Sequence, residues 1–135
     1  MRKRFLVVTA MTAAAAVFSA VALAANYHFV GSQSCTQSGG TVSCSFSVAG
    51  LGNASTATAS IRSPFQCVKT TSHEVRPGGL ASSGSQTFTV RNGRIDVTNL
   101  SLTASCPDQF SPEFTGPVTV IVNGVTVGTI PITPA

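Results

Sequence analysis

Apolar and polar residues alternate strictly from Thr41 to Val48. Valine, cysteine and phenylalanine fall at every second position, with serine and threonine between them. A period of two residues is typical of a strand with one buried and one solvated face. Similar runs recur between Gly, Asn and Pro residues, and no stretch combines helical spacing with a plausible cap. The pattern predicts an all-β chain, folded as a single antiparallel β-sandwich of the immunoglobulin-like kind.

Two Asn-Gly dipeptides, at positions 92–93 and 123–124, predict tight hairpins because both central residues of a type I′ turn need positive φ. The second turn is expected to place Val122 opposite Val125 and Val120 opposite Val127. The first is expected to pair Val90 with Ile95, Phe88 with Val97 and Arg91 with Arg94.

The first two dozen residues have the composition of a signal peptide. Three basic residues at positions 2–4 precede an apolar, Ala-rich run from Phe5 to about Val21, and Ala22-Leu23-Ala24 supplies a small-residue cleavage site after Ala24. The alternative is a retained membrane anchor, but the run is at the short limit for spanning and lacks a basic stop-transfer cluster. We therefore expect residues 1–24 to be removed and residues 25–135 to form one secreted domain, extracellular or in the cell envelope.

A third predicted turn, Gly39-Gly40, decides how the four cysteines pair. It places Cys35 opposite Cys44 at a non-hydrogen-bonded site, where Cα atoms lie about 4.5 Å apart, within disulfide range. Cys67 and Cys106 then remain for a second bridge. Cysteines behind an export signal are typically structural disulfides, and no Cys-x-x-C motif suggests redox chemistry. We expect no metal and no cofactor.

The charge balance changes once the signal is set aside. Three of the eight basic residues belong to the signal. The rest of the chain has five basic and four acidic residues, which gives it a net charge of +1. The high isoelectric point of the whole chain therefore gives no support to nucleic-acid binding. Without the signal, no membrane partner is expected either.

Several segments resemble a group of small secreted bacterial proteins of uncharacterised function. They are Val48-Ala49-Gly50-Leu51-Gly52-Asn53, Cys67, Gly78-Gly79, Asn92-Gly93 and Cys106-Pro107. The resemblance implies a secreted β protein and favours the bridge between Cys67 and Cys106. Members of the group carry a Cys-x-Asn-x-Gly-Gly segment, which this chain lacks after Cys67. No functional residue can be carried over, because the group has no assigned activity.

Catalytic motifs are absent from the sequence. There is no Gly-x-Ser-x-Gly, and the position that would complete His-Glu-x-x-His after His73 is Pro77. The chain after the signal has only four acidic residues, of which Asp108 and Glu113 are close enough in sequence to approach each other. A turn-stabilising role for Asp108 is the simpler interpretation.

The segment from Lys69 to Gly84 lacks any period, and a loop of this length is either functional or merely tolerated. Its chemistry-bearing residues are Lys69, His73, Glu74 and Arg76. We expect this segment to be the binding loop of a non-catalytic domain that contacts a partner protein. Two alternatives stay open: a secreted protease inhibitor that presents Lys69, and a small hydrolase or small-ligand carrier.

Overall fold

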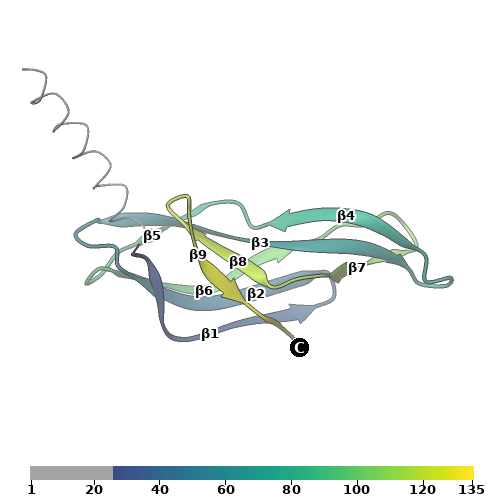
Figure 1. The fold of residues 1–135 in the computed structure, drawn as a ribbon, viewed down its shortest axis with the longest axis horizontal. Helices are drawn as coiled ribbons and strands as arrows, with labels where there is room; N and C mark the ends of the chain where they lie inside the picture. Colours follow the sequence, from purple (N-terminus) through teal and green to yellow (C-terminus); the bar gives the residue numbers. More distant parts are fainter. Residues whose placement is uncertain (1–25) are drawn as a thin grey trace, which may run out of the picture.

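The computed structural model describes residues 26–135, which form ten β-strands in two stacked sheets (Figure 1). The all-β, two-layer architecture confirms the fold class predicted from the alternation pattern. The predicted signal peptide and its cleavage site after Ala24 lie outside the described residues. Among residues 26–135, no helix is long and apolar enough to cross a membrane.

The first layer, sheet A, has four strands in the order β10-β1-β2-β6. They are β1 (His28–Ser38), β2 (Thr41–Ala49), β6 (Arg94–Thr103) and β10 (Ile132–Pro134). The second layer, sheet B, has six. They are β3 (Thr56–Lys69), β4 (Val75–Ser82), β5 (Gln86–Thr89), β7 (Phe110–Phe114), β8 (Val118–Val122) and β9 (Val125–Ile130). One pair departs from the predicted antiparallel arrangement, because β10 runs parallel to β1.

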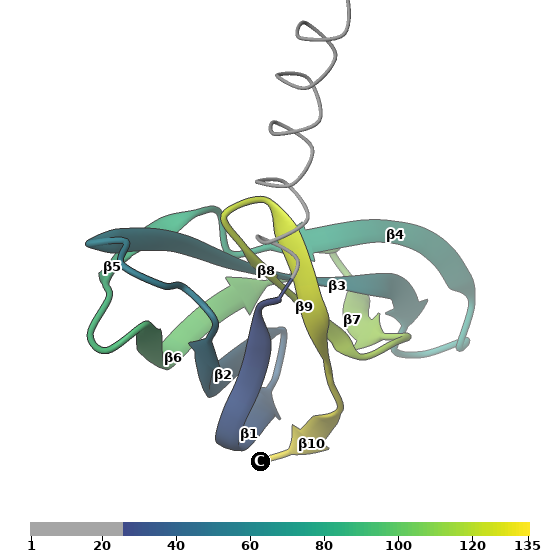
Figure 2. The same ribbon diagram turned by 60° about the vertical axis from the view of Figure 1, so that its left-hand side comes forward.

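Strand β3 organises sheet B along its whole length (Figures 1 and 2). One of its edges pairs first with β5 and then with β4, and the other pairs first with β8 and then with β7. Pro64 lies where the partner changes, after Arg62 pairs with β8 and before Phe65 pairs with β7. A proline without an N–H fits an inner strand only at such a break in the ladder. The second half of β3 therefore forms a three-stranded extension with β4 and β7.

The core lies between the two sheets and is built as the alternation predicted. On β2, the alternate residues Val42, Cys44, Phe46 and Val48 are all buried. Sheet B faces them with another set of fully or nearly fully buried side chains: Ala57, Ala59, Ile61, Val118, Val120 and Val122. Because these side chains are small or β-branched, they fill a thin space between two pleated surfaces.

The Gly39-Gly40 and Asn123-Gly124 turns form as predicted. Ser38 pairs with Thr41 across the first turn, and Val122 pairs with Val125 across the second. Asn123 and Gly124 have φ values of 50° and 80°, as a type I′ turn requires. A bulge then shifts the register of the second hairpin, so Val120 pairs with Gly128 and the predicted pairing with Val127 is wrong.

The Asn92-Gly93 turn also forms, but its predicted hairpin does not continue. Arg91 and Arg94 exchange two backbone hydrogen bonds of 2.9 and 3.0 Å, as expected. Beyond them β5 joins β3 in sheet B and β6 joins β2 in sheet A, so the predicted pairs of Val90 with Ile95 and Phe88 with Val97 are wrong. The turn connects two sheets, because each strand finds a longer partner in its own layer.

Both predicted disulfides are present. Cys35 and Cys44 join neighbouring strands with their Cα atoms 4.0 Å apart. Cys67 of β3 joins Cys106, which follows β6, with a Cα–Cα distance of 5.8 Å. Two disulfides with no free cysteine in the described residues indicate an oxidising compartment of the extracellular type.

Three edge strands carry a proline: Pro77 in β4, Pro112 in β7 and Pro134 in β10. In β4 the orientation of the proline can be deduced. The Lys69 N–H donates to the Glu74 carbonyl oxygen, and bonded pairs alternate along an antiparallel ladder, so the backbone nitrogen of Pro77 faces away from β3. Its ring therefore removes an N–H that would otherwise be exposed on the open edge.

Candidate functional site

The segment predicted to be a long binding loop is a hairpin. Residues 75–82 form β4, which pairs with β3 from Val68 opposite Val75 to Arg62 opposite Ser82. Only residues 70–74 connect the two strands, so the prediction of an unstructured segment from Lys69 to Gly84 is wrong. The segment lacks a sequence period because β4 is an edge strand, and all but one of its residues are exposed.

The tip of this hairpin is fixed by backbone hydrogen bonds around Lys69. Its N–H donates to the Glu74 carbonyl oxygen at 2.8 Å, and its own carbonyl accepts from the N–H of His73 at 2.9 Å. The N–H of Thr70 donates to the carbonyl oxygen of Gln109, which ties the tip to the segment before β7. Both backbone groups of Lys69 are thus engaged, so the residue does not offer free main-chain groups for strand-like pairing with a protease.

Two of the four predicted binding residues come together. The Arg76 Nε lies 3.1 Å from Glu74 Oε2, and the Arg76 guanidinium lies 4.7 Å from the centre of the Phe110 ring. Within residues 26–135, the side chains of Lys69 and His73 form no ion pair. The ion pair is about half exposed, so it orders the tip but adds little stability.

The opposite face of the hairpin carries an apolar strip that the sequence analysis did not identify. We call it the β4 strip: Pro64 and Val68 on β3, with Val75, Pro77 and Leu80 on β4. Gln66 lies between Pro64 and Val68 on the same face, where its side-chain amide donates to Glu113 of β7. Val75 and Leu80 are the exposed large hydrophobic residues of the described chain, with 55% and 59% of their surface accessible. A single exposed apolar side chain is ordinary, whereas two on one face beside an open edge make that face a candidate interaction surface.

A β-bulge assembles this strip. Val75 and Leu80 are an odd number of residues apart and would face opposite sides of a regular strand. A register shift between Phe65 and Gln66 leaves Gly78 without a partner and returns Leu80 to the side of Val75. A Cβ atom at Gly78 would lie 2.5 Å from the Phe65 ring, so only glycine fits there.

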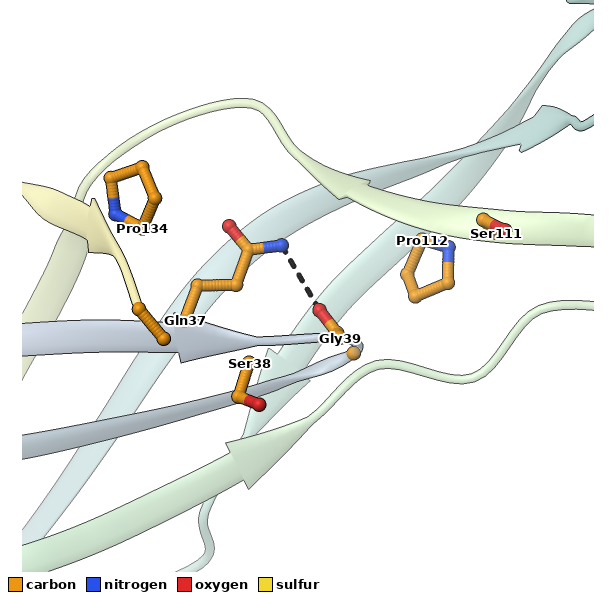
Figure 3. Close-up of a pocket in the computed structure, with 8 residues that line it drawn as sticks. Gln37, Ser38, Gly39, Ser111, Pro112 and Pro134 are labelled. Atoms are coloured by element: carbon orange, nitrogen blue, oxygen red, sulfur yellow. Dashed lines mark hydrogen bonds between the residues drawn. The ribbon is translucent and has the colours of Figure 1, made fainter.

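A cleft opens on another side of the molecule, between β1 and β10 of sheet A and β7 of sheet B (Figure 3). Its volume is about 740 Å³, and a second hollow of about 360 Å³ adjoins it through the shared residues Gln37 and Pro134. The larger part is lined by Gln37, Ser38, Gly39, Gly40, Ser111, Pro112, Pro134 and Ala135. We call the two hollows together the β1–β7 cleft.

Three of the four acidic side chains in the described residues form a hydrogen bond or an ion pair with another side chain. Glu74 pairs with Arg76, Glu113 accepts a hydrogen bond from the Gln66 side-chain amide, and Asp96 accepts from the Ser47 hydroxyl and from Arg94. The bond from Ser47, followed by the bond and charge of Arg94, lowers the pKa of the Asp96 carboxyl. In the part of the chain that the structure describes, no three His, Cys, Asp or Glu residues cluster to hold a metal ion.

No protein-family model, curated protein or solved structure matches this chain. The resemblance to small secreted bacterial proteins therefore stays a prediction.

Proposed function

We propose that this chain is a non-catalytic secreted or cell-envelope domain that binds a partner protein through the β3–β4 hairpin. One observation carries the proposal: the β4 strip exposes more than half of the surface of Val75 and of Leu80. The strip lies on a rigid support, because β3 is anchored to β4, β7 and β8, and Cys67 is bridged to Cys106. Such a surface loses little conformational entropy when it binds.

The charges around the strip indicate the chemistry of the partner. Arg62 shares the face of the strip, because it lies two residues before Pro64 on β3. Lys69 and the Arg76–Glu74 pair lie on the other face, and together these four residues give the hairpin a net positive charge. A complementary surface would combine an apolar patch with carboxylates at its rim. The apolar contact would supply affinity, and the charges would speed association and orient the partner.

The contact is expected to use side chains rather than the open strand edge. Pro77 removes one outward N–H of β4, and the bulge at Gly78 interrupts the ladder next to it. Both features oppose addition of a partner strand along this edge. The hairpin geometry also disfavours the protease-inhibitor alternative. The N–H and carbonyl of Lys69 are already bonded within the turn, so they are not free to pair with the backbone of a protease.

Site-directed photo-cross-linking would test the proposal. A photoreactive residue at Leu80 would be compared with the same residue at Thr98, an exposed position on β6 of the other sheet. A protein captured only from position 80 would be purified and its affinity measured for the wild type, Val75→Ser, Leu80→Ser and the control Thr98→Ser.

Each serine substitution in the strip should weaken binding at least about tenfold, because burying such a side chain contributes about 1.5–3 kcal/mol. Thr98→Ser should leave the affinity unchanged, and added salt should slow association. Equal affinities for Leu80→Ser and the wild type would reject the strip as the binding surface.

A further inference from the structure

The β1–β7 cleft is a second candidate binding site, separate from the β4 strip. Its larger part, of about 740 Å³, falls within the range of about 300–1,000 Å³ typical of small-molecule sites. The adjoining hollow is more apolar and is lined by Phe114, Pro117, Pro131 and Ile132 beside the shared residues. The cleft therefore has a polar end and an apolar end, with Gln37 between them.

No ionisable side chain lines either part of the cleft. A charged ligand would lose hydration on entering and would find no opposite charge from a side chain in return. The side chains of the cleft therefore favour a ligand that is neutral over the surface it buries.

The lining offers several hydrogen-bond acceptors. Four prolines supply no N–H at all, and the N–H of Ala135 already donates to the Gln37 carbonyl oxygen. The side-chain amide of Gln37 stands in the middle of the cleft between Pro112 and Pro134 (Figure 3), and its Nε2 donates to the carbonyl oxygen of Gly39 at 3.0 Å. Its Oε1 is left to accept from a ligand, together with the hydroxyls of Ser38 and Ser111.

We propose that the β1–β7 cleft binds a neutral oligosaccharide of two or three sugar units. Sugar hydroxyls can donate to Gln37 Oε1 and exchange hydrogen bonds with the hydroxyls of Ser38 and Ser111, and they carry no charge. The carbon-bound hydrogens of a sugar ring can pack on the proline rings and on Phe114 at the apolar end. Gln37, at the junction of the two parts, is the residue that orients the ligand.

Titration followed by NMR tests this proposal on the intact disulfide-bonded domain. The probes are the neutral trisaccharides of cellulose, starch, xylan and chitin, with the glucosamine trimer and trigalacturonate as charged counterparts. Each is added to about 10 mM, which reveals dissociation constants near 1 mM. The observed signals are the Gln37 side-chain amide and the backbone amides of residues 38–40 and 111.

Two pairs of variants separate the cleft from its surroundings. Gln37→Leu removes the central amide, and its control Gln33→Leu changes an exposed glutamine on the same strand outside the cleft. Pro134→Trp fills the cleft, and its control Thr133→Trp alters the neighbouring residue, whose side chain faces the other side of β10.

At least one neutral trisaccharide should shift the cleft signals in a saturable way. Gln37→Leu should weaken that binding about tenfold, Pro134→Trp should abolish it, and both controls should bind as the wild type does. The proposal is overturned if no neutral trisaccharide shifts these signals, if a charged trimer binds more tightly, or if Gln33→Leu weakens binding as much as Gln37→Leu. None of these outcomes bears on the β4 strip, because the variants leave the strip unchanged.

Discussion

Removing the Cys67–Cys106 bridge should cost the domain a large part of its stability. The bridge spans 39 positions and closes a loop that contains β4, β5 and β6. In the chain-entropy model, a loop of this length restricts the unfolded chain by about 4 kcal/mol at 25 °C. Small domains have about 5–15 kcal/mol of total stability, so the double variant Cys67→Ala/Cys106→Ala should be close to unfolding.

Urea denaturation would measure this loss and its origin. Because the bridge acts mainly on the unfolded state, its removal should increase the m-value as well as lower the midpoint, since the released chain exposes more surface. The comparison variant is Cys35→Ala/Cys44→Ala, whose bridge spans nine positions within one hairpin. Its m-value should change less, although the loss of two buried sulfur atoms adds a packing cost.

A loss below about 1 kcal/mol with an unchanged m-value would refute the reasoning. It would mean that the unfolded chain is already compact around β4, β5 and β6, so that the bridge restricts nothing.

Three other outcomes follow from single contacts. Gly78→Ala should destabilise the domain by about 1–3 kcal/mol in thermal or urea unfolding, because its Cβ would overlap the Phe65 ring. Ser47→Ala should raise the pKa of Asp96 toward its ordinary value in an NMR titration, since the hydroxyl is the main cause of the lowered pKa. The lowered pKa of Asp96 stabilises the folded state at pH values above the pKa that Asp96 has in the unfolded chain. This stabilisation is lost as the pH falls through the pKa of Asp96 in the folded state, and it should be small because the carboxyl is exposed. Leu80→Ser should change the free energy of unfolding by no more than about 0.5 kcal/mol, so a larger loss would show that the β4 strip supports the fold.

Local chemistry was enough to predict the hairpin that contains the first disulfide. Gly39 tolerates the positive φ of 63° that the turn needs, and the turn sets the register that brings Cys35 opposite Cys44. The strict alternation in β2 likewise identified the buried face, because that face packs on the core over its whole length. These features depend on residues close in sequence.

The same turn chemistry was misleading at Asn92-Gly93. The dipeptide specifies the turn itself, but it carries no information on whether the flanking strands stay together. Phe88 pairs with Ala57 of β3, and Val97 pairs with Phe46 of β2, partners that are distant in the chain. The choice between sheets is a tertiary one, and pairing over long distances overrides the local signal.

The candidate sites were the least predictable part. An alternating sequence pattern appears when one face of a strand is buried. Only one residue of β4 is buried, so its sequence shows no such pattern. The bulge at Gly78 also places Val75 and Leu80 on the same face, although they are an odd number of residues apart. The β1–β7 cleft depends on Gln37, Pro112 and Pro134, which are brought together only by the packing of three separate strands.

The prolines of β4, β7 and β10 have a consequence for how this protein behaves when many copies are close together. A sandwich has open margins, and identical margins can join copy to copy into fibres. Pro77 removes a hydrogen-bond donor from the open edge of β4, and Pro112 and Pro134 leave β7 and β10 with one N–H fewer each. At these three margins, an arriving strand from another copy would therefore find one backbone donor fewer, which weakens copy-to-copy pairing there.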